Sequence, residues 1–161
     1  MSRSVELAAR LRRPWLTPLV RGYSRLGNYG LGWMAAGVAV GAAKGSPRLA
    51  VELPAVVVTA FGLNVAVKRA VGRGRPLSDA VAPHLIAAPG SSSFPSTHAA
   101  TAAAGAIAIA ARDLALLPVV VTAAVAMAAS RVYLGVHHGS DIAAGLVLGA
   151  AAGGVYALAV R

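Results

Sequence analysis

The chain has 161 residues, of which 57% are hydrophobic, with five acidic residues, no cysteine and a formal net charge of +10. The absence of cysteine excludes disulfides and thiol chemistry, and a chain of this length is expected to form one domain over residues 1–161. The positive charge is not arranged as a basic face interleaved with aromatic residues, so no nucleic-acid partner is expected.

Residues 1–25 are predicted to form a basic amphipathic segment that lies at the lipid headgroups and stays attached as an uncleaved anchor. We expect Pro14 and Pro18 to divide it into a short helix and a second turn. The alternative is a disordered basic tail. The apolar positions of the segment recur every four residues, at Leu7, Leu11, Trp15 and Leu19.

Long apolar runs follow this segment, and they determine the fold class. A helix that crosses a bilayer needs about 20 mostly apolar residues, with roughly 17 as the lower limit. The runs therefore predict an all-α integral-membrane helical bundle of about five transmembrane helices, with a soluble alanine-rich bundle as the weaker alternative. The third run is short unless residues 95–98 form its first turn. The predicted spans are residues 26–43, 49–67, 99–111, 114–130 and 142–160.

Glycines recur every four residues in the first and last predicted spans, and such stripes permit close contact between helices. The sequence leaves open whether they pack within one bundle or between the subunits of a homo-oligomer. The glycines are Gly37, Gly41 and Gly45 in one stripe and Gly145, Gly149 and Gly153 in the other.

Residues 69–94 form a long connection rich in Gly, Pro and Ser, and loops of this length are often functional. Alternating the five spans across the membrane gathers polar side chains from distant parts of the chain on one face. Because polar groups near a membrane are costly unless paired, we expect these side chains to form a site. They are Lys68, Arg75, Ser96, His98, Arg131, His137 and Asp141.

The chemistry of these side chains indicates phosphoryl transfer. On a helix, His137 and Asp141 would share a face, so the carboxylate could orient the imidazole as a nucleophile or base. His98 could act as a general acid, and Ser96 precedes a helix start, where phosphate binds well. Three cations complete the predicted anion site: Lys68, Arg75 and Arg131.

Three motifs together resemble the signature of the type 2 phosphatidic acid phosphatases, which are integral-membrane lipid phosphatases. The resemblance spans about half of the chain, in the family's order and with its spacings. The first motif joins Lys68 to Arg75-Pro76, the second is PSTH at residues 95–98, and the third joins Ser130-Arg131 to His137 and Asp141.

This resemblance implies that His137 forms a phosphohistidine, that Asp141 orients it, and that His98 protonates the leaving oxygen and later activates water. It implies no metal and no cofactor. The phosphate oxygens would be held by Lys68, Arg75, Ser96, Thr97 and Arg131. Thr97 stands where the family usually has glycine, so its side chain is expected to narrow the approach to phosphate.

Other interpretations remain open. A zinc site could be built from His98, His137, His138 and Asp141, although three nearby cations favour an anion. His138 is expected to point away from His137, and His84 and Asp79 are expected to lie in a solvated loop. A catalytically silent protein that binds phosphorylated lipid is the alternative of a different class.

The distribution of Lys and Arg predicts that the site faces the cytoplasm. The predicted site face carries eleven of these residues and the opposite face four, and cytoplasmic faces of membrane proteins are enriched in them. In the inner membrane, such a site would act on lipid intermediates of the inner leaflet. The resemblance then suggests a polyprenyl-linked sugar phosphate, such as decaprenyl-phosphoryl-phosphoribose, with undecaprenyl diphosphate, phosphatidic acid and phosphatidylglycerol phosphate as alternatives.

Overall fold

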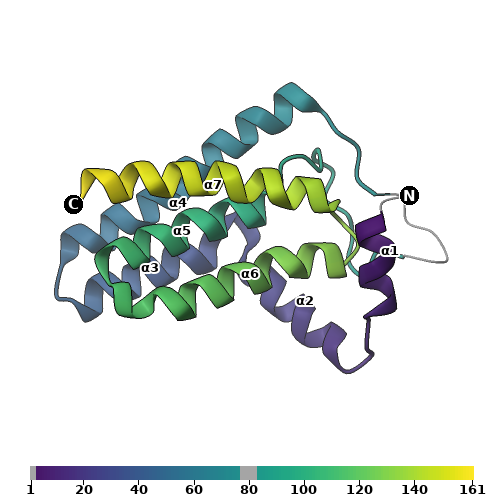
Figure 1. Ribbon diagram of the computed structural model, residues 1–161, viewed down its shortest axis with the longest axis horizontal. Helices are drawn as coiled ribbons and strands as arrows, with labels where there is room; N and C mark the ends of the chain where they lie inside the picture. The colour runs from purple at the N-terminus through teal and green to yellow at the C-terminus, as the bar shows by residue number, and fades with distance from the viewer. Residues whose placement is uncertain (1–2, 77–82) are drawn as a thin grey trace.

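The computed structural model describes residues 3–76 and 83–161, and these residues form helices and connecting loops without a strand (Figure 1). The long helices lie side by side along one axis, and the chain termini lie at opposite ends of that axis. The predicted all-α class is confirmed. The elements are α1 (Arg3–Arg10), α2 (Leu16–Leu26), η1 (Asn28–Gly30), α3 (Leu31–Ala43), α4 (Pro47–Val71), α5 (Thr97–Arg112), η2 (Leu114–Leu116), α6 (Leu117–Tyr133) and α7 (Gly139–Ala159).

In the described part of the chain, three helical segments are long and apolar enough to cross a membrane: α4, η2 with α6 (Leu114–Tyr133), and α7. The two other predicted spans correspond to α3, with 13 residues, and α5, with 16. At about 1.5 Å per residue these two helices are shorter than the hydrocarbon core of a bilayer. The membrane bundle is therefore confirmed, whereas the length criterion does not support five full spans.

The predicted span at residues 26–43 is wrong at its beginning. Leu26 ends α2, and the turn that follows holds Tyr29 at φ 54° and Gly30 at φ 77°. Positive φ angles cannot continue a right-handed helix, so α3 starts only at Leu31. Glycine is required at position 30, because a Cβ there would also lie 2.8 Å from Cγ1 of Val57.

Helix α5 runs through the middle of the bundle and is almost entirely buried, because its alanines and glycine let neighbouring helices approach closely (Figure 1). A Cβ on Gly149 of α7 would lie 2.0 Å from the carbonyl oxygen of Ala100. On Gly41 of α3, it would lie 2.3 Å from the backbone nitrogen of Ala50 in α4. These glycines therefore serve packing within one bundle. Gly45 is different: it forms a turn with φ 60° and has no close neighbour.

The N-terminal segment forms two helices, and both pack against the bundle. Proline divides it as predicted, but α2 continues past Pro18 for another two turns to Leu26. Arg12 Nε donates a hydrogen bond of 2.9 Å to the carbonyl of Tyr133, and Tyr23 donates one of 2.6 Å to the carbonyl of Ala123, both in α6. The predicted apolar stripe faces outward, with exposed fractions of 61% to 68% at Leu7, Leu11, Trp15 and Leu19.

Candidate active site

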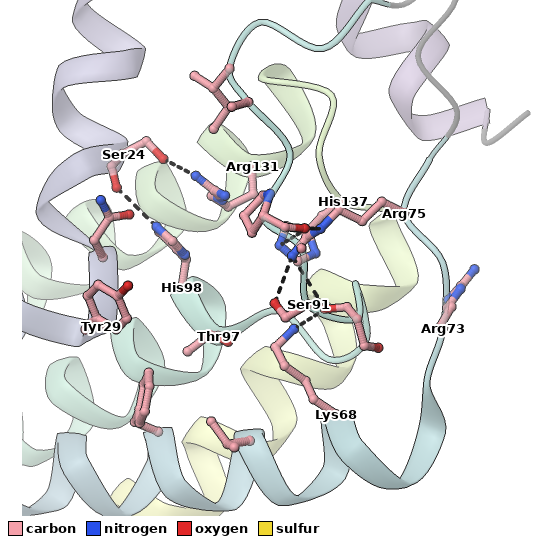
Figure 2. Close-up of a pocket in the computed structure, with 18 of the residues that line it drawn as sticks. Ser24, Tyr29, Lys68, Arg73, Arg75, Ser91, Thr97, His98, Arg131 and His137 are labelled. Atoms are coloured by element: carbon pink, nitrogen blue, oxygen red, sulfur yellow. Dashed lines mark hydrogen bonds between the residues drawn. The ribbon is translucent and has the colours of Figure 1, made fainter.

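One end of the bundle holds a cavity of about 1380 Å³, and residues far apart in the sequence meet there (Figure 2). It lies where α4 ends, where α5 begins and where α6 passes into the loop before α7, with α2 on one side. The connection predicted at residues 69–94 begins only at Gly72, because α4 continues to Val71, and it contributes lining residues on both sides of residues 77–82. Of the predicted site residues, six line the cavity: Lys68, Arg75, Thr97, His98, Arg131 and His137.

His137 lies in the loop before α7 and is only 2% exposed. Its Nε2 lies 3.2 Å from Nη1 of Arg75, and its Nδ1 lies 3.5 Å from Oδ2 of Asp141. A guanidinium N–H can only donate, so Nε2 accepts and the ring proton belongs on Nδ1, which faces the carboxylate. Burial, followed by the charges of Arg75, Arg131 and Lys68, lowers the pKa of His137 to about 4, although Asp141 opposes the shift. The result is a neutral imidazole with its Nε2 lone pair on the cavity side.

The expected helical relation between His137 and Asp141 is wrong, because α7 begins at Gly139 and His137 precedes it. His138 is the N-cap of α7, and its extended backbone turns its ring toward Asp141 as well. The distance from Nδ1 of His138 to Oδ2 of Asp141 is 3.2 Å, so the expectation that His138 points away is also wrong.

Asp141 is fully buried behind the cavity wall, and several donors hold its carboxylate in place. Nη1 of Arg73 lies 3.0 Å from Oδ1, and the backbone N–H of His138 donates to Oδ2 at 2.8 Å. Arg73 was not predicted as part of the site. Because it is one of the six residues between Lys68 and Arg75 that the first motif leaves unspecified, only its proximity to Arg75 could have suggested it.

The other histidine contacts the N-terminal segment. Nε2 of His98 lies 3.2 Å from the carbonyl oxygen of Ser24 in α2, and Ser24 Oγ accepts a 2.6 Å hydrogen bond from Nη1 of Arg131 (Figure 2). Since a carbonyl only accepts, Nε2 of His98 carries a proton. Ser24 is 2% exposed, and a Cβ on Gly27 would lie 2.5 Å from Cδ2 of His98. No sequence pattern indicates this contact, because more than seventy residues separate its two partners.

The three predicted cations face the same space. Lys68 Nζ donates to the carbonyl of Ser92 at 2.6 Å, and Arg75 donates to the carbonyls of Val136 at 2.8 Å and Pro89 at 2.9 Å. Within the described residues, the buried Nε of Arg131 has no hydrogen-bond partner. A phosphate group, with several acceptor oxygens, suits such a set of donors.

Ser96 and Thr97 both form hydrogen bonds within the protein, and Ser96 caps its helix as its position predicts. Ser96 caps α5, accepting from the N–H of Ala99 at 3.5 Å, and it does not line the cavity. Its side chain therefore contacts the helix start and not the cavity. Thr97 lines the cavity, but its hydroxyl donates at 2.7 Å to Oδ1 of the buried Asn64 in α4. The residue at the family's glycine position thus links α5 to α4.

The remaining polar candidates of the sequence lie elsewhere. Nε2 of His84 lies 2.9 Å from the carbonyl oxygen of Pro76, and Asp79 falls outside the described residues. Among residues 3–76 and 83–161, no group of three or more His, Asp or Glu side chains is placed to hold a metal ion.

Comparisons with known proteins identify relatives of this chain. The sequence model of the PAP2 superfamily matches residues 49–161, which include all three motifs. The chain belongs to the PAP2 superfamily. A decaprenylphosphoryl-5-phosphoribose phosphatase of Mycobacterium tuberculosis is 36% identical over 151 residues, which cover 92% of this chain and 82% of the relative. One of Mycolicibacterium smegmatis is 35% identical over 141 residues, covering 86% and 76%.

A solved structure of a PAP2 member has the same fold. The transmembrane PAP2-type phosphatidylglycerolphosphate phosphatase from Bacillus subtilis superposes with a TM-score of 0.78 at 25% identity, covering 95% of this chain and 80% of that chain. This PAP2 protein is therefore a membrane phosphatase, a phosphoric monoester hydrolase with a helical fold.

Proposed function

We propose that this PAP2 protein hydrolyses the terminal phosphate monoester of a polyprenyl-phosphoryl sugar phosphate through a phosphohistidine, without a metal. The observation that carries the proposal is the convergence of a neutral, cavity-facing imidazole with a second histidine and three cations on one cavity. Phosphate-binding alone requires only the cations. The pair of histidines supports a reaction.

In the first step, Nε2 of His137 forms a bond to phosphorus as the bond between phosphorus and the leaving oxygen breaks. The carboxylate of Asp141, 3.5 Å from Nδ1, stabilises the positive charge that develops on the ring. His98, in its doubly protonated form, gives a proton to the leaving alkoxide and becomes neutral. Lys68, Arg75 and Arg131 neutralise the equatorial phosphate oxygens.

In the second step, water replaces the alcohol. His98, now neutral, accepts a proton from the water as its oxygen bonds to phosphorus, and the bond from phosphorus to Nε2 of His137 breaks. Inorganic phosphate leaves, and both histidines return to their initial states. Nothing beyond these side chains and water is needed to balance the reaction.

The substrate class is supported by the mycobacterial relatives, whose names specify a decaprenylphosphoryl-5-phosphoribose phosphatase and whose sequences align with most of this chain. The position of the cavity also fits, since it opens at the end of a membrane bundle, where a lipid-linked sugar phosphate would lie.

We also propose that the site faces the cytoplasm from the inner membrane. Helices α1 and α2, which carry Arg3, Arg10, Arg21 and Arg25, lie at the site end of the bundle (Figure 1). At the far end, Lys44 pairs with Asp113 at 2.8 Å and Arg48 pairs with Glu52. Because the positive-inside rule counts Lys and Arg, the site end is the cytoplasmic one. Intact cells carrying Ala88→Cys or Ala115→Cys would be treated from outside with a thiol reagent. The cysteine at position 115 should be labelled and the cysteine at position 88 should not. The reverse pattern would refute this orientation.

The reaction itself is tested by phosphate release from purified protein in detergent, using a polyprenyl-phosphoryl phosphopentose, phosphatidic acid and phosphatidylglycerol phosphate. His137→Ala should abolish release from all of them and keep the melting behaviour of a folded protein, and a metal chelator should leave the wild-type rate unchanged. Release by His137→Ala at the wild-type rate would refute the nucleophile. Binding without release by the wild-type protein would favour a silent lipid-binding protein, and a strict metal requirement would revive the zinc site.

A further inference from the structure

The cavity is larger than one phosphoryl group requires. Pockets for drug-sized ligands have volumes of about 300–1,000 Å³, and this one, at about 1380 Å³, exceeds that range. Its lining divides into two parts. The reacting end holds His137 and Arg75, and the other end lies between α2 and α4, where Tyr29 is seen across the cavity from Arg75 (Figure 2).

The end between α2 and α4 has cations of its own: Arg21, Arg25 and Arg69. Arg21 and Arg25 are four residues apart, so they lie on one face of α2, while Arg69 follows Lys68 on α4. In the part of the chain that the structure describes, none of the three forms a hydrogen bond or an ion pair with protein. We call these residues the outer arginines.

The outer arginines differ from most other arginines of the structure, which form hydrogen bonds or ion pairs with protein groups. Arg73 binds Asp141, Arg75 binds backbone carbonyls, Arg131 binds Ser24, and Arg12 binds the carbonyl of Tyr133. Arg21, Arg25 and Arg69 are exposed and line one cavity, and like charges gathered at a cleft favour the binding of an anion there. Their arrangement therefore points to a ligand anion.

The same end of the cavity also offers apolar surface. The rings of Tyr29 and Phe61 lie with their centroids 6.2 Å apart, tilted by 52°, and both line the cavity together with Val65. A ligand that places an anion among the outer arginines can thus continue into an apolar chain. A phosphodiester that joins a sugar to a prenyl chain has this chemistry.

We infer that the outer arginines form a second anion subsite, which binds the phosphodiester of the substrate while the deep cations hold the phosphate monoester that is cleaved. This inference rests on the proposed function, since it assigns both phosphate groups of a polyprenyl-phosphoryl phosphosugar to one cavity. It predicts a preference for lipids with two separated phosphate groups over lipids with one. Anionic headgroups of the bilayer are the other source of the same chemistry.

Two synthetic probes separate these sources: farnesylphosphoryl-5-phosphoribose, which has both phosphates, and farnesyl 5-phosphoriboside, in which an uncharged glycosidic bond replaces the phosphodiester. We would measure kcat/KM for phosphate release in neutral detergent and in vesicles with phosphatidylglycerol. Both probes would also be titrated into the His137→Ala protein and their binding measured. This variant keeps the outer arginines, so the titration tests the subsite even without turnover. The variants are Arg21→Gln, Arg25→Gln, Arg69→Gln, their combination, and Arg161→Gln as a control at the far end of α7.

The expected result is a weaker interaction with the diester probe alone. Each single variant should lower its kcat/KM in neutral detergent about two- to fivefold, as for a partly exposed ion pair. The combined variant should remove the preference for the diester probe, in kcat/KM and in binding, and Arg161→Gln should change neither.

Two results would overturn the subsite. One is a preference for the diester probe that survives in the combined variant. The other is an equal loss for both probes confined to anionic vesicles, which would assign the outer arginines to bilayer headgroups. Failure of the wild-type protein to release phosphate from either probe would refute the proposed function separately, while the binding titration would still decide the subsite.

Discussion

The hydrogen bond between Ser24 and Arg131 gives a direct test of whether the N-terminal segment is part of the active site. Ser24→Ala removes the hydroxyl that accepts from Nη1 of Arg131 at 2.6 Å, in a place where the arginine is 3% exposed. A hydrogen bond to a charged group contributes about 1.5–3 kcal/mol, and a buried donor that loses its acceptor keeps the desolvation cost. The Nε of the same arginine has no partner among the described residues, so this bond is what orients the guanidinium.

If that orientation is needed to hold the reacting phosphate, most of the lost hydrogen-bond free energy raises the free energy of the transition state. At about 1.4 kcal/mol per tenfold, kcat/KM for phosphate release should fall roughly 10- to 100-fold in Ser24→Ala. Ser24→Thr keeps the hydroxyl and should retain most of the activity.

The matched control is Thr122→Ala, which removes a hydroxyl from α6 that donates only to the carbonyl of Pro118 at 2.8 Å. It should leave kcat/KM unchanged. The backbone carbonyl of Ser24 that faces His98 is present in every variant, so the comparison isolates the arginine contact. A folded Ser24→Ala protein with kcat/KM within twofold of wild type would refute the assignment of Ser24 as a positioning residue.

Two further predictions concern stability, both read from the apparent melting temperature in detergent. Burial lowers the pKa of His137 from 6.5 to about 4, so the unfolded chain takes up this proton first and stability should fall as pH drops from about 6.5 toward 4. The fall should be smaller in His137→Ala; equal falls would contradict a buried neutral imidazole. Gly149→Ala should destabilise by about 1–3 kcal/mol, because its Cβ meets the backbone of Ala100 in α5. Gly154→Ala on the same helix has open space and should not destabilise, so similar losses in both would argue against the α5–α7 contact.

The candidate site was largely predictable because its residue types and spacings are set by chemistry. His98, His137 and the cations Lys68, Arg75 and Arg131 were predicted to converge, and they line one cavity. Alternating spans across a bilayer is a strong topological constraint, and it was enough to bring these residues to one end of the bundle.

The local geometry of the site was less predictable, because it depends on where helices start. A spacing of four residues predicted a shared helical face for His137 and Asp141, but His138 caps α7, so the pair meets across a loop and a helix start. The role of Ser96 was hard to predict for the same reason. A serine before a helix can bind phosphate or cap the helix, and here its hydroxyl is used for the cap.

The sequence by itself determined that this protein is a helical membrane phosphatase and predicted histidine chemistry for it, since apolar length, glycine spacing and three polar motifs are all local patterns. Only the tertiary structure decided that α2 enters the site, that Arg73 holds Asp141, and that Gly149 meets α5 and not another subunit. The physical reason is that these contacts join segments separated by tens of residues. Their partners are selected by the packing of whole helices, which no short stretch of sequence encodes.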